Sequence, residues 1–298
     1  MNQYFSTVAI IGKSNVGKST LINYIIGQKI SIVTHKIQTT RNTIKGIFTC
    51  DNYQIVFFDS PGIFSPKNIM GKQMLKQAWN TTFGVDFIML TVNLKNNFLS
   101  EEDIAFLNKL LKRKESHLLL IVNKIDLIKN FNKDFEKFFY DKLNKTFTSF
   151  LQKYQVFFIS SIQGSGIADV LSYIKKFSAL GKWMFDKDDI TTSSMRFIAS
   201  ELTREVLFLS LGKELPYNLV VETEEWKKID ENNILIRQVI TVVKESHKII
   251  IIGKSGKNIA NIGKKSRIKI NEELKINCHL KLFVKVRQNI LDKPIKSF

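Results

Sequence analysis

An uninterrupted match to the phosphate-binding pattern G-x-x-x-x-G-K-[ST] lies near the N-terminus: Gly12-Lys13-Ser14-Asn15-Val16-Gly17-Lys18-Ser19. The apolar run 8–11 before it is typical of a buried parallel strand, and residues 20–26 after it continue as a helix. Glycines let backbone N–H groups close around a phosphate, and the unpaired amides of a helix N-terminus favour an anion. A glycine-rich turn could match by chance, but the flanking strand and helix favour a nucleotide site. We expect all eight residues to contact nucleotide, with Ser19 also ligating Mg²⁺.

The choice of base is indicated by Asn123-Lys124-Ile125-Asp126, which follows the apolar run 118–122 and whose four residues we expect to contact the nucleotide. A carboxylate at Asp126 can accept hydrogen bonds from guanine N1–H and the exocyclic amine, whereas adenine lacks this donor pair. Four residues alone are a weak signal, but their position after a phosphate loop strengthens it. Ser160-Ser161, which ends another apolar run, is expected to contact guanine from its backbone.

A third motif, Asp59-Ser60-Pro61-Gly62, ends the apolar run 54–58, and we expect its residues and the following Ile63 to contact the nucleotide. We expect Asp59 to hold Mg²⁺ through a water and Gly62 N–H to contact a γ-phosphate. The polar segment Thr39-Thr40-Arg41 can order around γ-phosphate and Mg²⁺. Thr40 is the expected metal ligand, and Thr39 is its competitor.

Composition and charge suggest a second kind of partner. The chain has 298 residues, enough for two domains, and 44% are hydrophobic. No apolar run approaches 18 residues, an export signal is absent, and Cys50 and Cys278 have no metal spacing, so we expect a cytoplasmic protein. Lys and Arg number 45 against 27 Asp and Glu, a net charge of +18. Residues 237–298 carry 15 basic and 4 acidic side chains, which indicates a nucleic acid or an anionic surface.

The expected organisation is a nucleotide-binding domain over residues 1–180, a linker over 181–194 and a second domain over 195–298. The first is expected to be α/β, with a mixed, mostly parallel sheet, helices on both faces and a last helix over 167–180. The second is predicted as a smaller α+β domain in the order α-β-β-α-α-β. Its first helix spans 195–211, and its strands span 218–223, 234–243 and 276–286.

Inside this second domain, Gly253-Lys254-Ser255-Gly256 joins the apolar segment 249–252 to an amphipathic helix. G-x-x-G alone is almost uninformative, but lysines surround it, at Lys248, Lys254, Lys257, Lys264 and Lys265. This combination resembles a type II KH domain, which implies that the two glycines, Ser255 and these lysines bind RNA. A solvated basic helix–turn–helix and an anionic membrane surface are the alternatives.

The motifs N-V-G-K-S-T, Q-T-T-R, D-S-P-G and N-K-I-D, in this order, resemble those of translation-factor-type small GTPases and, in their wording, the Era family. The C-terminal region resembles a type II KH domain, in which the G-x-x-G loop clamps about four single-stranded nucleotides. The resemblance implies a GTP-hydrolysing switch that uses Mg²⁺, binds the 3′ end of small-subunit ribosomal RNA and assists assembly of a 30S-type subunit. We expect a monomer with peripheral membrane contact as an addition. Ser60 and Ser161 stand where the family commonly has Thr and Ala.

The residue after Gly62 is Ile63, where Ras-like proteins have a water-orienting Gln. In related GTPases with this difference, a loop asparagine supports K⁺ binding, which implies that role for Asn15. The residues expected to carry hydrolysis are therefore Asn15, Lys18, Thr40, Asp59 and Gly62. The alternative is a nucleotide-sensing RNA-binding scaffold with negligible turnover, which single-turnover hydrolysis with and without K⁺ would separate from an enzyme.

Overall fold

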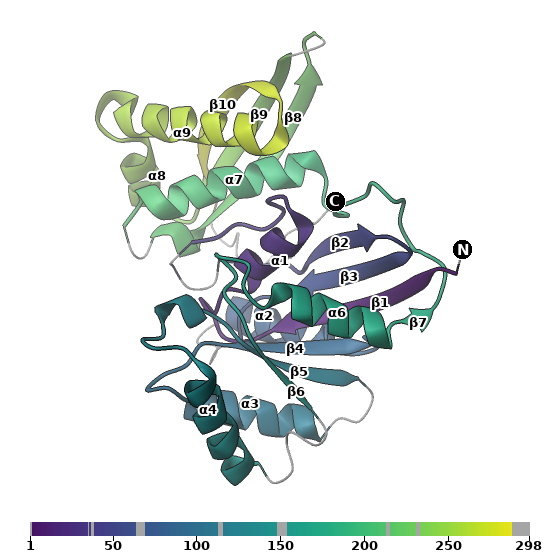
Figure 1. The fold of residues 1–298 in the computed structure, drawn as a ribbon. Helices are drawn as coiled ribbons and strands as arrows, with labels where there is room; N and C mark the ends of the chain where they lie inside the picture. Colours follow the sequence, from purple (N-terminus) through teal and green to yellow (C-terminus); the bar gives the residue numbers. More distant parts are fainter. Residues whose placement is uncertain are drawn as a thin grey trace. The chain divides into compact units, whose positions relative to one another are not determined.

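The computed structural model describes residues 2–34, 36, 39–63, 69–112, 116–147, 154–212, 215–230 and 233–287. The chain forms two compact units, one from residues 1–27 and 37–192 and the other from residues 28–36 and 193–298 (Figure 1). Residues 288–298, at the end of the predicted second domain, lie outside the described residues. Within the described ranges, no helix is long and apolar enough to cross a membrane.

The first unit is built on one mixed sheet, in which β2 runs antiparallel to β3 and the central strands are parallel. Its strand order is β2 (Ile44–Cys50), β3 (Tyr53–Asp59), β1 (Tyr4–Ile11), β4 (Phe87–Val92), β5 (His117–Val122) and β6 (Gln155–Phe158). Side chains of β4 are buried along its whole length, as expected for a strand covered on both faces.

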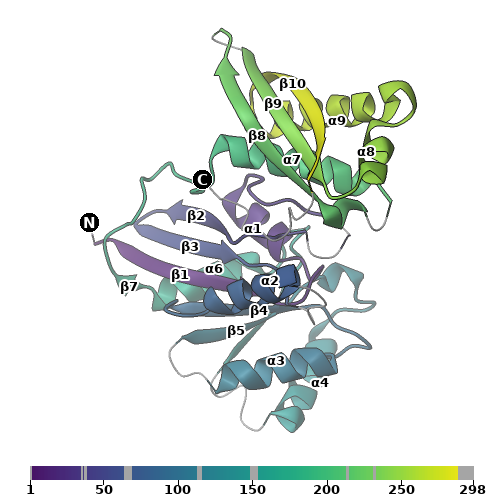
Figure 2. The same cartoon turned by 180° about the vertical axis from the view of Figure 1, so that it is seen from behind.

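Helices cover both faces of this sheet, which confirms the predicted fold class. Figure 1 shows α1 (Lys18–Ile26) and α6 (Ile167–Phe177) on the near face, and Figure 2, from behind, shows α2 (Ile69–Asn80) and α3 (Glu101–Leu111) on the other. Residues of α2, α3 and α4 (Lys133–Thr146) share one core with β1, β4 and β5. Because the parallel strands end at one edge, their loops converge there.

The segment after α6 differs from the sequence expectation. The helix ends at Phe177, and β7 (Ala179–Leu180) pairs antiparallel with Tyr4 and Phe5. This pairing is possible because β4 pairs with β1 only from Val8 onward, which leaves the start of β1 to β7. Residues 181–192, predicted to be a linker, group with the first unit, where Ile47 N–H donates to Ile190 O at 2.8 Å. A polar, acidic composition does not reveal such backbone pairing.

The second unit has the predicted order α-β-β-α-α-β. Its elements are α7 (Met195–Ser210), β8 (Leu219–Lys228), β9 (Asn233–Val242), α8 (Glu245–Ile252), α9 (Lys257–Leu274) and β10 (Asn277–Val286). Strand β9 lies between β8 and β10, antiparallel to the first and parallel to the second. Leu207, Ile240, Ile251 and Ile262 join helices and sheet in one core. Residues 28–36 group with this unit, and Lys29 Nζ lies 2.9 Å from a Glu205 carboxylate oxygen.

Candidate active site and nucleic-acid interface

The turn between β1 and α1 requires glycine at two positions. Gly12 has φ 146°, and a Cβ there would lie 2.1 Å from the carbonyl oxygen of Thr91 in β4. Gly17 has φ 100°, and a Cβ there would lie 2.3 Å from Asn123 Nδ2. Real side chains do not tolerate such contacts or readily adopt these φ values. The loop backbone is therefore pressed against the strands that carry the other motifs.

Lys18 begins α1 and is only 6% exposed. Its ammonium donates to Gly12 O at 3.1 Å and to Lys13 O at 2.8 Å, so the side chain folds back over its own loop. Burial lowers the pKa of Lys18 from 10.5 to about 8, while the Asp59 carboxylate acts in the opposite direction. An anion at the loop would stabilise the charged form and raise this pKa again.

The low pKa of Lys18 predicts proton uptake when a nucleotide binds above pH 8. At pH 9 much of the unliganded protein carries neutral Lys18, and nucleotide phosphates favour its protonation, so affinity falls as the pH rises from 8 towards 10. At pH 7 Lys18 is mostly protonated already and contributes little uptake. Calorimetric titration with GDP in buffers of different ionisation enthalpy measures the uptake at both pH values. Equal proton exchange at pH 7 and pH 9 would contradict this assignment.

Three oxygen-bearing side chains meet beside the phosphate loop. Ser19 Oγ donates to Asp59 Oδ2 at 2.7 Å and lies 3.0 Å from Thr40 Oγ1. Asp59 is fully buried at the end of β3. Hydroxyl and carboxylate oxygens are the donors that Mg²⁺ prefers, so this set fits the predicted metal. We retain Thr40 as the candidate ligand, rather than Thr39, because its hydroxyl reaches Ser19.

The Asp59–Gly62 motif closes against the phosphate loop. A Cβ on Gly62 would lie 2.5 Å from Ser14 Oγ and 2.8 Å from Ser14 N, so only glycine fits there. Ile63 N–H donates to Gly12 O at 2.9 Å, and its side chain, 2% exposed, packs in the core. Ile63 therefore cannot orient a water. The Ser60 hydroxyl donates to Ile10 O at 2.7 Å, so it binds the backbone of β1.

Asn123 connects the phosphate loop to the base motifs. Its side-chain amide donates to Val16 O at 2.8 Å. Its Oδ1 accepts from Lys124 N at 2.8 Å, from Ser161 N at 3.0 Å and from Ser161 Oγ at 2.9 Å. The side chain is buried, so its role is to hold three loops in one arrangement. Sequence reasoning had placed it among the nucleotide contacts without this bridging role.

Asp126 is exposed in a short 3₁₀ turn that begins at Ile125, and Ser160 Oγ donates to its Oδ1 at 2.5 Å. The carboxylate is thus oriented by the protein while its surface remains open to a base. Ser160 N–H donates to Ser165 O and Ser161 N–H to Asn123 Oδ1, so both amides have partners inside the protein. The predicted guanine contact from these amides stays a prediction, whereas the Ser160 hydroxyl gains an orienting role.

Two other residues of the phosphate loop have side-chain or backbone partners elsewhere in the unit. Lys13 Nζ donates to Ser100 Oγ at 2.5 Å and forms an ion pair with Glu102 at 2.8 Å, both at the start of α3. Its ammonium is therefore held away from the loop backbone. Lys124 Nζ donates to Asn15 O at 2.6 Å. A K⁺ contact from Asn15 stays a prediction.

The G-x-x-G segment forms a tight turn between α8 and α9. Gly253 has φ 71°, Ser255 φ 50° and Gly256 φ 75°, and Gly256 caps the N-terminus of α9. Asn258 supports the turn by donating its amide to Ile250 O at 2.9 Å. Positive φ values hold the turn backbone in an exposed, compact form, while Lys254 and Lys257 supply charge beside it.

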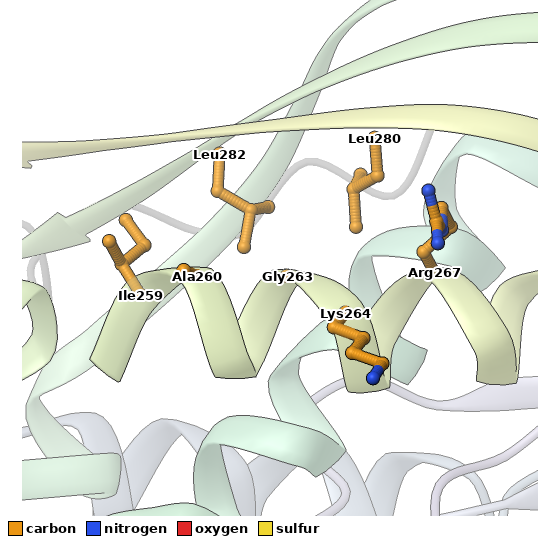
Figure 3. A pocket seen from close by; sticks show the side chains of 7 residues that line it. All are labelled: Ile259, Ala260, Gly263, Lys264, Arg267, Leu280 and Leu282. Carbon is orange, nitrogen blue, oxygen red and sulfur yellow. The ribbon is translucent and has the colours of Figure 1, made fainter. Parts of the chain in front are cut away.

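A groove of about 460 Å³ lies between α9, the helix that follows this turn, and β10 (Figure 3). Its walls are Ile259, Ala260, Gly263, Lys264, Arg267, Leu280 and Leu282. Lys264 belongs to it, but Lys265 lines a different hollow, between α7 and α9. Sequence reasoning named the lysines and missed the apolar walls, although helical spacing in α9 and alternation in β10 signal them.

Comparison with known proteins places this geometry in a family. Residues 7–124 match the family model "50S ribosome-binding GTPase", and residues 214–291 match the KH domain. The chain is 42% identical to GTPase Era of Rickettsia bellii over 283 residues, which are 95% of this chain and 92% of that protein. The chain belongs to the Era family of GTPases. It is also 39% identical to GTPase Era of Mesorhizobium japonicum, covering 96% of this chain and 90% of that protein.

Solved Era structures have the same fold over nearly the whole length. A structure of Era with MgGDPNP and nucleotides 1506–1542 of 16S ribosomal RNA has a TM-score of 0.89 at 30% identity, covering 98% of this chain and 96% of that one. A structure of an Aquifex aeolicus Era variant bound to GDP·AlF₄⁻ gives the same TM-score and identity, covering 98% and 97%. The family and the two-domain fold class predicted from the sequence are confirmed.

Proposed function

We propose that this Era-family protein is a switch that hydrolyses GTP and binds single-stranded small-subunit ribosomal RNA. The observation that supports it is the presence, in one chain, of base motifs hydrogen-bonded to the phosphate loop and to each other, and of a G-x-x-G turn whose following helix lines a groove. We assign the nucleotide to the predicted domain 1–180 and the RNA to the predicted domain 195–298.

For hydrolysis, a water attacks the γ-phosphorus while the bond to the β–γ bridging oxygen breaks, giving GDP and inorganic phosphate. Lys18 lies at the loop that would hold the β- and γ-phosphates and neutralises charge there in the ground state and the transition state. Gly62 N–H would donate to a γ-phosphate oxygen, which the close packing of Gly62 against Ser14 of the phosphate loop supports. Ser19, Thr40 and Asp59 would hold Mg²⁺, which supplies Lewis-acid neutralisation when bound. Because Ile63 is buried and apolar, it cannot take up the proton of the attacking water, which passes to a phosphate oxygen.

The RNA partner is inferred from the two-domain relatives. The family model matching residues 7–124 refers to the 50S subunit, whereas the Era structure that covers 98% of this chain holds a 16S RNA fragment. Because the G-x-x-G groove lies in the KH region that the model for residues 7–124 does not cover, the full-length relative is the better guide. We therefore propose the 3′ end of small-subunit RNA, and assembly of the small subunit in the cytoplasm. Membrane contact is an alternative use of the basic surface.

Replacing Lys254 and Ser255 together by aspartate is expected to weaken RNA binding tenfold or more. The change replaces a positive charge by two negative charges where phosphates approach, so phosphate contacts are lost and the salt dependence of binding also flattens. Fluorescence anisotropy with single-stranded RNA from the 3′ end of the small-subunit RNA measures both effects. Duplex RNA should compete poorly, because a KH groove takes splayed bases.

A matched control is Lys265→Asp, which reverses charge on α9 away from the groove. It should weaken binding much less than the double variant, and both variants should bind GTP as the unmodified protein does. If the double variant binds this RNA as tightly as the unmodified protein, the RNA-binding proposal is wrong. The basic region would then be a general electrostatic surface.

A further inference from the structure

Arg267 differs in its surroundings from Lys264, which lies one turn earlier on the same helix. It lies on α9 in the wall of the groove, where Leu280 and Leu282 of β10 form the opposite side. Figure 3 shows its side chain turned towards β10, whereas the side chain of Lys264, one turn earlier, points away from the strand. Two cations on neighbouring turns of one helix therefore face different environments.

The electrostatics of β10 agree with this orientation. Cys278 is 2% exposed, and burial raises the pKa of its thiol to about 11, while the charge of Arg267 acts to lower it. The guanidinium is thus close enough to act on a group of the strand. In the part of the chain that the structure describes, Arg267 is exposed and makes neither a hydrogen bond nor an ion pair. Its donors are available to a ligand in the groove.

Distance along the helix separates Arg267 from the phosphate-clamping turn. Arg267 follows the Gly256 cap by eleven positions, which correspond to about 16 Å at roughly 1.5 Å per residue. A KH loop holds the backbone of about four nucleotides, so the turn and Arg267 would contact different nucleotides. Between them the floor contains Gly263, where a Cβ would already lie 3.6 Å from Leu282 Cδ1. A base that lies over the groove beside Gly263 would present its edge to the Arg267 guanidinium, because both residues line the same groove.

A guanidinium presents two parallel donors in a fixed plane. Guanine O6 and N7 form a matching pair of acceptors on one edge, and cytosine N3 and O2 form another. On the corresponding edges of adenine and uracil, a hydrogen-bond donor stands beside the acceptor. These bases can therefore accept a hydrogen bond from only one of the two guanidinium N–H groups. Resting on the RNA-binding function proposed above, we propose that Arg267 is a specificity-determining residue, which selects guanine or cytosine over adenine or uracil at one nucleotide in the groove.

The test compares Arg267→Gln, Arg267→Lys and the control Lys264→Gln. A random pool of single-stranded RNA about eight nucleotides long, twice the clamped length, first defines the preferred sequence of the unmodified protein. Each position of that sequence is then changed to every other base, and affinities are measured by fluorescence anisotropy. At one position the unmodified protein should prefer guanine or cytosine by about 5- to 100-fold. Which of the two is preferred identifies the base edge.

Arg267→Gln should lose this preference at that position alone, and Lys264→Gln should keep it. Arg267→Lys retains the charge without the fork, so it should keep most of the affinity for the adenine- or uracil-substituted RNA and lose the discrimination. A uniform loss across all sequences, with a lower salt slope, would show that Arg267 contacts phosphate and would overturn the inference. That result leaves the RNA-binding proposal intact, which fails only if the Lys254/Ser255 double variant also binds normally. Unchanged GTP hydrolysis and thermal unfolding confirm that each variant is folded.

Discussion

Replacing Asp126 by asparagine is expected to weaken GTP binding by about 2–4 kcal/mol, roughly 30- to 1,000-fold. The Asp126 carboxylate is held by the Ser160 hydroxyl at 2.5 Å and is exposed, so it is oriented to accept from guanine N1–H and the exocyclic amine. An asparagine side chain would place its NH₂ group, a donor, against one of these two guanine donors. It also lacks the negative charge of the carboxylate. Xanthine carries an oxygen in place of that amine, so the variant should gain affinity for xanthosine nucleotides.

Competition between labelled GDP and unlabelled GDP, GTP or xanthosine diphosphate measures the switch in preference. Ser160→Ala serves as a graded control, because it removes the orienting hydrogen bond and leaves the carboxylate in place. Its loss of GDP affinity should be smaller than that of Asp126→Asn, and its guanine preference should persist. If Asp126→Asn binds GDP as tightly as the unmodified protein, the guanine site lies elsewhere.

The elements that sequence reasoning predicted well are those whose local signals and tertiary environment agree. The buried strand β5 ends at the base motif, and α1 begins directly at Lys18 of the phosphate loop. Strand β10 begins one residue later than predicted and shows the expected alternation. In each case the apolar residues follow the spacing of the element, and a turn motif lies at one of its ends.

The elements that sequence reasoning missed depend on distant backbone. The pairing of β7 with β1 requires that no other strand occupies that edge of β1 at Tyr4 and Phe5. The course of residues 181–192 depends on hydrogen bonds to β2 and Gln54. The same holds within the site. Motif spacing predicts that Ser161 lies near guanine. The structure shows in addition that the Ser161 amide donates to Asn123 Oδ1 and that Lys13 forms an ion pair with Glu102. Such partners lie 38 and 89 positions away along the chain.

Replacing Lys18 by alanine is expected to weaken both GDP and GTP binding by tens to hundreds of fold. Hydrogen bonds to a charged partner contribute about 1.5–3 kcal/mol each, and the buried ammonium of Lys18 is placed to give phosphates at least one. Thr40→Ala should behave differently. Its hydroxyl lies on the Ser19 and Asp59 side of the site, so it should slow hydrolysis while changing GDP affinity by less than about twofold.

The matched control is Lys13→Ala, which removes the same charge from the same loop. The Lys13 ammonium forms ion pairs with Glu102 and Asp103 of α3, so its loss should alter GDP affinity little compared with the loss of Lys18. Fluorescent GDP titrations of the three variants, with thermal unfolding to verify folding, measure these differences. If Lys13→Ala and Lys18→Ala weaken GDP equally, only the net charge of the loop matters. If Thr40→Ala weakens GDP as much as Lys18→Ala does, Thr40 is part of the nucleotide-binding scaffold, and its assignment to the γ-phosphate-dependent metal site is wrong.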